Sequence, residues 1–182
     1  MAGMRRTLLA VAMSVLMLAG CAEAKVEPLA RFGLAGKSAV EVIDRLDRLA
    51  LAERPADLKA SVRPDALLVT ADGEERSLAI PDDKFYLSLA PYVEHTHECF
   101  HHSLTTCKGE LAAAALEVRI VDQAGAVLVE GARTTFANGF VGFWLPRGIT
   151  GTVRVTYAGK TAESAFSTGP DAPTCLTTLQ LA

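Results

Sequence analysis

Apolar residues recur with helical spacing between Ser38 and Pro55. Ser38 followed by Glu41 three residues later has the pattern of a capping box, which starts a helix. The chain should leave the helical conformation near Arg54, because the residue before a proline avoids the α region. The pattern therefore predicts one helix with an apolar stripe and with charged residues on its other faces. The stripe comprises Val40, Ile43, Leu46 and Leu49, and the charged set comprises Asp44, Arg45, Asp47 and Arg48.

The next segment changes from helical spacing to a hairpin pattern. Residues 66–70 and 75–80 flank the turn sequence Ala71-Asp72-Gly73, and Pro81-Asp82-Asp83 then interrupts the chain. We therefore predict a small α+β unit over residues 36–82.

From Lys84 onward apolar and polar residues alternate with a period of two, which is typical of strands. Turn residues separate the runs at intervals of roughly 8–12 residues, as in sandwiches and open barrels. We predict the α+β fold class, with the helix-plus-hairpin N-terminal unit followed by a β-sandwich-like antiparallel C-terminal domain over 84–182, whose core holds Trp144. The expected strands cover residues 85–90, 116–121, 126–130, 139–145, 151–157, 161–167 and 176–181.

The beginning of the chain has the pattern of an export signal. Arg5-Arg6 precede an apolar run over residues 7–20 that is too short to cross a bilayer. Leu18-Ala19-Gly20-Cys21 resembles a bacterial lipobox, which predicts a signal peptide over 1–20 and lipidation of Cys21. The alternative is an ordinary signal peptide with a cysteine near its cleavage site. Residues 21–35 would then tether the domain, on the outer face of the cytoplasmic membrane or elsewhere in the periplasm and cell envelope.

Charge and cysteine content narrow the chemistry. The formal net charge of −3 argues against binding of nucleic acid. With Cys21 lipidated, the thiols of Cys99, Cys107 and Cys175 remain in an oxidising compartment. Because three is an odd number, at least one thiol stays unpaired within a monomer.

All four histidines of the chain lie between positions 95 and 102, close to two of these thiols. Imidazoles and thiols are the soft and borderline metal ligands, so the cluster predicts a metal or redox site. The alternative is a structural envelope module in which a Cys99–Cys107 disulfide closes a loop. The histidines are His95, His97, His101 and His102.

Copper suits this donor set best. Three cysteines are too few for an ordinary iron–sulfur cluster, and the spacing of Cys99 and Cys107 is wider than in structural zinc sites, so zinc is the less favoured occupant. Thiolates select Cu(I), and thiols also reduce Cu(II) while they oxidise to a disulfide. Cys175, at the entrance to the last expected strand, could complete a three-thiol cluster. No conventional catalytic site is predicted.

One competing motif is a literal H-E-x-x-H over residues 97–101, the zinc metalloprotease signature. It requires a helix that presents His97 and His101 on one face, with Glu98 as the base, and a third ligand. Glu117 or Glu130 would have to provide that ligand. The β-branched and aromatic residues around the motif disfavour this interpretation.

The string T-H-x-C-x-x-H-S-L-T-T-C-x-G-E over residues 96–110, with a third cysteine near the C-terminus, resembles the CueP family of periplasmic copper-binding proteins. The resemblance implies copper sequestration with cupric-reducing behaviour, copper tolerance, and supply of copper to an envelope superoxide dismutase. It places the functional cysteines at Cys99, Cys107 and Cys175 and the motif histidines at His97 and His102. The Cys21 anchor departs from a soluble periplasmic pattern.

Overall fold

The computed structural model describes residues 29–182. The predicted signal peptide over 1–20, the lipidation site Cys21 and the first part of the predicted tether lie outside these residues. Within residues 29–182, no helix is long and apolar enough to span a membrane. Leu29 and Leu34 are buried in the N-terminal core, so the last part of the predicted 21–35 tether belongs to the folded unit.

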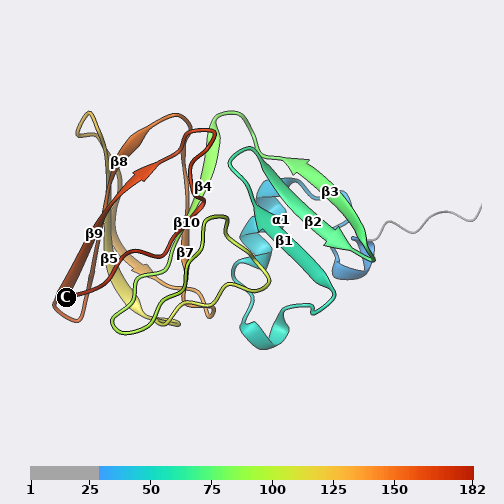
Figure 1. Cartoon of the computed structure of the whole chain (residues 1–182), viewed down its shortest axis with the longest axis horizontal. Coiled ribbons are helices and arrows are strands. Elements are labelled where there is room, and N and C mark those ends of the chain that lie inside the picture. The colour runs from blue at the N-terminus through green and yellow to red at the C-terminus, as the bar shows by residue number, and fades with distance from the viewer. Residues whose placement is uncertain (1–28) are drawn as a thin grey trace, which may run out of the picture.

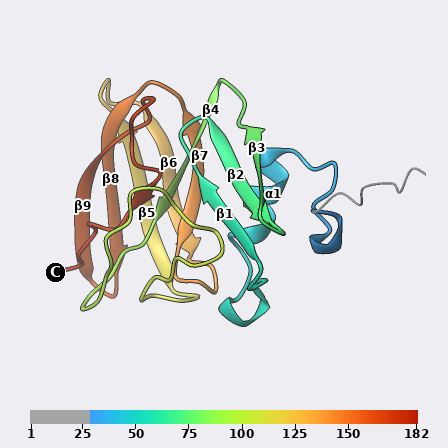
Figure 2. The ribbon, with the colours of Figure 1, turned by 45° about the vertical axis from the view of Figure 1, so that its right-hand side comes forward.

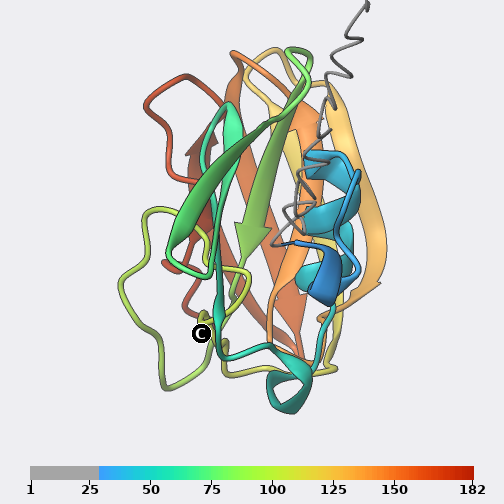
Figure 3. The same cartoon turned by 90° about the vertical axis from the view of Figure 1, so that its right-hand side faces the viewer.

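The N-terminal unit packs helix α1 against a three-stranded antiparallel sheet (Figure 3). The sheet has the order β1-β2-β3, and the predicted hairpin forms its second and third strands. Strand β1 was not predicted, although its buried and exposed residues alternate. The elements are η1 (Ala30–Phe32), α1 (Ala39–Leu46), η2 (Leu51–Glu53), β1 (Leu58–Val62), β2 (Ala66–Ala71) and β3 (Glu74–Ala79).

Helix α1 begins as predicted but ends early. The Ser38–Glu41 capping box is present, which confirms the predicted start. The prediction that the helix continues to Arg54 is wrong, because the chain leaves the helix after Leu46. Asp47 then carries a fully buried carboxylate, and its carbonyl accepts a hydrogen bond from Asn138 Nδ2 at 2.7 Å. These tertiary contacts replace further helical turns, and they correct the assignment of Asp47 to a polar face.

The C-terminal part contains two sheets that share one core, and β4 and β7 lie between the N-terminal unit and the four-stranded sheet (Figure 1). The sheets have the strand orders β10-β4-β7 and β6-β5-β8-β9. Together with the helix-containing unit, these sheets agree with the predicted α+β class. The strands are β4 (Lys84–Leu89), β5 (Ala115–Asp122), β6 (Val127–Thr134), β7 (Val141–Pro146), β8 (Thr150–Tyr157), β9 (Lys160–Ser167) and β10 (Cys175–Leu176).

Two expectations about this part are wrong. The last strand has only two residues instead of spanning 176–181, and it pairs with β4 in parallel, so the sheets are not wholly antiparallel. Beyond Leu176 the chain forms no further strand, and it pairs through an isolated bridge between Gln180 and Tyr92 and through hydrogen bonds between Ala182 and Thr161. Leu179 and Leu181 are nevertheless buried, which explains the apolar alternation that suggested a longer strand.

Strand β4 is buried on both faces because it lies between two cores. Phe85, Leu87 and Leu89 face the C-terminal core, whereas Tyr86 packs in the N-terminal core. Trp144 of β7 also packs against the N-terminal core, which corrects its predicted place in the C-terminal core. Its ring centroid lies 4.7 Å from that of Tyr86. Figure 2 shows β4 and β7 beside the N-terminal strands.

Candidate metal centre

The predicted ligands lie mainly in the long segment between β4 and β5, which is irregular over residues 90–114. The N-terminal unit holds this segment: Val62 N donates to His102 O at 2.8 Å, and Leu104 N donates to Ala60 O at 2.9 Å. Strand β1 therefore fixes the backbone on both sides of Ser103, which forms an isolated antiparallel bridge with Ser61.

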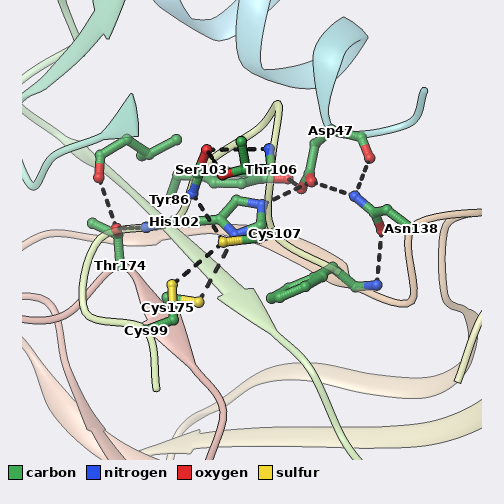
Figure 4. A network of polar contacts seen from close by, with 12 residues as sticks. Asp47, Tyr86, Cys99, His102, Ser103, Thr106, Cys107, Asn138, Thr174 and Cys175 are labelled. Atoms are coloured by element: carbon green, nitrogen blue, oxygen red, sulfur yellow. Dashed lines mark hydrogen bonds and ion pairs between the residues drawn. The ribbon is translucent and has the colours of Figure 1, made fainter. Parts of the chain in front are cut away.

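Four of these side chains converge on one point (Figure 4). The ligand atoms of Cys99, His102, Cys107 and Cys175 all lie within 4.8 Å of one another, and no other group of this kind occurs in residues 29–182. The Sγ atoms of Cys99 and Cys107 are 3.5 Å apart, and Cys175 Sγ lies 3.8 Å from His102 Nδ1. The three cysteines are free thiols. Three sulfur atoms and one imidazole nitrogen form a soft donor set of the kind that Cu(I) prefers.

Backbone hydrogen bonds bring the distant Cys175 to this point. The amide N–H groups of Thr174 and Cys175 both donate to Phe100 O, at 2.9 and 3.3 Å. The hydroxyl of Thr174 accepts from His102 N and donates to Val62 O. The pairing of β10 with β4 then fixes Cys175 beside Ser88. The centre thus depends on contacts among β1, β10 and the long segment.

The imidazole of His102 is completely buried and is held by Asp47. His102 Nε2 lies 2.9 Å from Asp47 Oδ1, and the same carboxylate accepts from Tyr86 Oη at 2.6 Å and from Asn138 Nδ2 at 2.9 Å. In the neutral ring, donation from Nε2 to Asp47 leaves Nδ1 free to face the thiols. A carboxylate that orients a histidine in this way is common around bound metals.

The same contacts shift the pKa values of both partners. Burial opposes the charged imidazole, but the charge of Asp47 and its hydrogen bond raise the pKa of His102 well above its usual value. For Asp47, burial opposes the carboxylate, and the charge and hydrogen bond of His102 nevertheless hold its pKa below the usual value. The buried pair is therefore ionic in the metal-free protein near neutral pH.

The neighbouring thiols lower the pKa of Cys107. Hydrogen bonds from the thiols of Cys175 and Cys99 lower the pKa of Cys107, and Ser103 N also donates to its sulfur at 3.3 Å. The Cys107 thiolate in turn raises the pKa of Cys175, which acts as the donor.

Arg54 brings a fixed positive charge to the cluster from the N-terminal unit. Its Nη1 donates to Cys107 O at 2.6 Å, whereas its buried Nε and Nη2 atoms make no hydrogen bond. Arg54 is the residue directly after η2, and it is half-buried. Arg54 and Asp47 were not predicted as site residues, because nothing in the local pattern distinguishes them from other charges near the helix.

The other predicted histidines lie outside the four-ligand group. His97 and His95 line a cavity of about 730 Å³ that Cys99 and Cys107 also line. The rings of His97 and Phe140 meet edge to face, with centroids 6.1 Å apart. The ring of His102 also contacts Phe140, with a centroid distance of 4.5 Å. His101 is half-buried beside Phe100, and its Nδ1 has no hydrogen-bond partner.

The geometry contradicts a metalloprotease site. Residues 97–101 are not helical, so the backbone does not present His97 and His101 in the way that the H-E-x-x-H motif requires. The proposed third ligands, Glu117 and Glu130, are exposed on β5 and β6, and neither belongs to the metal-ligand group found in the described part of the chain. Glu130 forms an ion pair with Arg119 instead.

Comparison with known proteins identifies the family of the chain. The CueP family, described as periplasmic copper-binding protein CueP, matches residues 41–180. The crystal structure of S.CueP is 42% identical in sequence and has a TM-score of 0.79, and the match covers 85% of this chain and 94% of that chain. No curated protein matches the chain significantly. A family match over most of the chain, together with this structural similarity, establishes that the chain belongs to the CueP family of periplasmic copper-binding proteins.

Proposed function

We propose that the protein holds copper as Cu(I) at Cys99, Cys107, Cys175 and His102. The observation that carries this proposal is that their four ligand atoms lie within 4.8 Å of one another in a largely buried pocket. Cu(I) favours two or three soft ligands, and sulfur dominates this set. Metal binding would displace the protons of the thiols and of His102 Nδ1, so loading should release protons.

The same thiols can act as a reductant for Cu(II). Cys99 and Cys107, with sulfur atoms 3.5 Å apart, would each give one electron to a Cu(II) ion and then join in a disulfide. The balance is two Cu(II) ions and two thiols to two Cu(I) ions, one disulfide and two protons. Cys175 and His102 would remain as ligands. This is a stoichiometric reaction of the thiols, without a conventional turnover site.

In the cell envelope such a centre would sequester copper and support copper tolerance. Lipidation at Cys21 would keep the protein at a membrane surface, where it could also supply copper to an envelope superoxide dismutase or another cuproprotein. The geometry of the buried thiols supports sequestration directly. Delivery requires a client that can approach Cys99, the most exposed of the three described cysteines.

A titration of the reduced protein with Cu(I) under a competing chelator tests the central proposal. We expect a dissociation constant below about 1 nM that weakens by orders of magnitude in each Cys→Ser variant, and millimolar binding would overturn the proposal. Because three cysteines and one histidine also suit zinc, the same titration with Zn²⁺ is the control. If the protein bound Zn²⁺ but not Cu(I), zinc instead of copper would be the metal that it carries.

Counting free thiols after anaerobic addition of Cu(II) tests the reduction. The wild type should lose two thiols for every two Cu(II) ions reduced. In a Cys107→Ser variant the Cys99–Cys107 disulfide cannot form, so no thiols should be lost by that route. No thiol loss in the wild type would remove the redox role and leave the binding role intact.

A further inference from the structure

The cavity beside the thiol cluster is also lined by imidazole and carboxylate side chains. His95 and His97 line its wall, and Glu98 and Glu110 contribute carboxylates. Cys99 and Cys107 line the same cavity, so it is continuous with the proposed Cu(I) centre. An ion bound at the histidines would therefore already lie in the space from which the thiols are reached.

His97, one of the residues that line this wall, has an imidazole nitrogen without a hydrogen-bond partner. Its Nε2 is buried and makes no hydrogen bond, although a buried imidazole nitrogen normally has a partner. The ring is packed toward Phe140, whose side chain is fully buried and also contacts the ring of His102. Phe140 therefore contacts both the outer and the inner histidine, while His97 stays outside the four-ligand group.

The backbone of this wall is fixed. The carboxylate of Glu110 accepts from the amide N–H groups of Val93, Glu94 and His95, at 2.8, 3.0 and 3.1 Å. Thr96 Oγ1 donates to Thr177 O at 3.0 Å. His95 and His97 thus lie on a segment whose backbone is held in place. The cavity lining contains two carboxylates, of Glu98 and Glu110, and one ammonium group, of Lys108, so its charged side chains are net negative.

We propose that His95 and His97 form an outer site that captures Cu(II) before it reaches the thiols. Imidazole and carboxylate groups suit Cu(II), whereas the inner sulfur atoms suit Cu(I), so the two sites divide the two oxidation states. This inference rests on the proposed function, because it assigns an entry site to the same copper centre. His101 does not line the cavity and has no part in the capture site.

Electron paramagnetic resonance with one equivalent of Cu(II) tests the outer site in a Cys99→Ser/Cys107→Ser/Cys175→Ser variant. We expect a Cu(II) spectrum with nitrogen hyperfine structure. When His95→Ala/His97→Ala are combined with the three cysteine substitutions, the nitrogen hyperfine splitting should disappear from the spectrum. Cu(II) binding should also weaken by about tenfold or more. Adding His101→Ala instead is the matched control and should leave the spectrum unchanged. A nitrogen-coordinated spectrum that survives His95→Ala/His97→Ala, or that is lost with His102→Ala alone, would overturn the proposal.

A second measurement separates this inference from the proposed function. In the chain with all its cysteines, His95→Ala/His97→Ala should leave the Cu(I) affinity within about threefold of wild type while slowing the loss of thiols to dilute Cu(II). Unchanged Cu(I) affinity also shows that the variant is folded. Unchanged rates of thiol loss would contradict the capture site, whereas weak Cu(I) binding by the wild type would contradict the centre itself.

Discussion

At the scale of single residues, the centre depends on side chains that are not ligands. Asp47 accepts hydrogen bonds from three groups that come from three different parts of the chain, including His102 and Tyr86. Arg54 contacts the backbone of Cys107. Both charges come from the N-terminal unit, so this unit is a structural part of the metal centre.

Replacement of Asp47 should be costly even without metal. Asp47→Asn leaves the buried His102 without its charge partner, and we expect a loss of about 3–5 kcal/mol in the free energy of unfolding. Asp44→Asn in the preceding helix α1 is the control, because an amide oxygen can still accept from Trp144 Nε1. The free energy of unfolding of Asp44→Asn should fall by less than about 1 kcal/mol. Urea unfolding of the reduced protein measures both, and equal losses would show that the buried pair has no special role.

The Asp47–His102 pair also predicts a pH dependence. The pKa of Asp47 is lowered, so its stabilisation is present above the ordinary aspartate value near ~4 and disappears as pH falls through its folded value. The pKa of His102 is raised, so its stabilisation is present below about 6.5 and disappears as pH rises through its folded value. The pair should therefore stabilise the metal-free protein most between pH ~4 and ~6.5. Unfolding free energies measured from pH 4.5 to 9 should give a flatter profile for Asp47→Asn, and parallel profiles would contradict this assignment.

Arg54 should strengthen copper binding through its charge. Cu(I) with three thiolates carries a net charge of −2, and a buried anion needs a nearby cation. Arg54→Gln keeps a hydrogen-bond donor for Cys107 O but removes the charge, and we expect Cu(I) affinity to fall by about tenfold. Arg54→Lys keeps the charge and should stay within about threefold of wild type. Chelator competition measures both, and equal affinities for Arg54→Gln and wild type would exclude the electrostatic role.

At the scale of elements, the long segment between β4 and β5 is irregular yet fixed. Strand β1 holds it near Ser103, and Gly109 N donates to Asn138 O at 2.7 Å at its other end. Gly109 and Gly139 pack backbone against backbone so closely that a Cβ atom on either would overlap the other, and Gly139 has φ +84°. The two glycines therefore set the position of the segment that carries Cys107.

The close approach of these glycines makes Gly109→Ala a test of the segment. The added methyl group would overlap the Gly139 carbonyl, and we expect a destabilisation of about 1–3 kcal/mol together with weaker Cu(I) binding. Gly169→Ala is the control, because its added atom would meet only Ser167 Oγ at an ordinary 3.5 Å. Urea unfolding and chelator competition measure the two effects. Cu(I) affinity that is unchanged in Gly109→Ala would show that the segment's position does not limit binding.

At the scale of the whole molecule, the sheet of β4 and β7 joins the two cores. Tyr86 and Trp144 pack in the N-terminal core, while Phe85 and Leu145 on the same strands pack in the C-terminal core. The metal centre crosses this boundary as well, because Asp47 belongs to one unit and Cys175 to the other. The two predicted units should therefore unfold together.

Calorimetry tests this coupling. We expect one transition in the metal-free protein, and Cu(I) at a free concentration a hundred times its dissociation constant should add about 2.7 kcal/mol of stability to that single transition. The Cys99→Ser/Cys107→Ser/Cys175→Ser variant is the control and should gain none from Cu(I). Two separate transitions, with Cu(I) shifting only one of them, would contradict the coupling.

The sequence by itself determined the features that depend on local pattern and composition. The Ser38 capping box, the 66–80 hairpin and most C-terminal strands follow from neighbouring residues. The crowding of histidines and cysteines between His95 and Cys107 indicated a soft-metal site, because donor chemistry can be identified without coordinates. The family resemblance rested on the same short segment.

Only the tertiary structure decided which of those donors act together and which charges support them. Cys175 reaches Cys107 through the pairing of β10 with β4, and His102 joins the ligand group whereas His97 does not. The burial of Asp47 depends on contacts with residues 39 to 91 positions away in the chain. The physical reason is that burial and ligand geometry arise from packing between distant segments, whereas the periodicity of a sequence records only which face of an element is apolar.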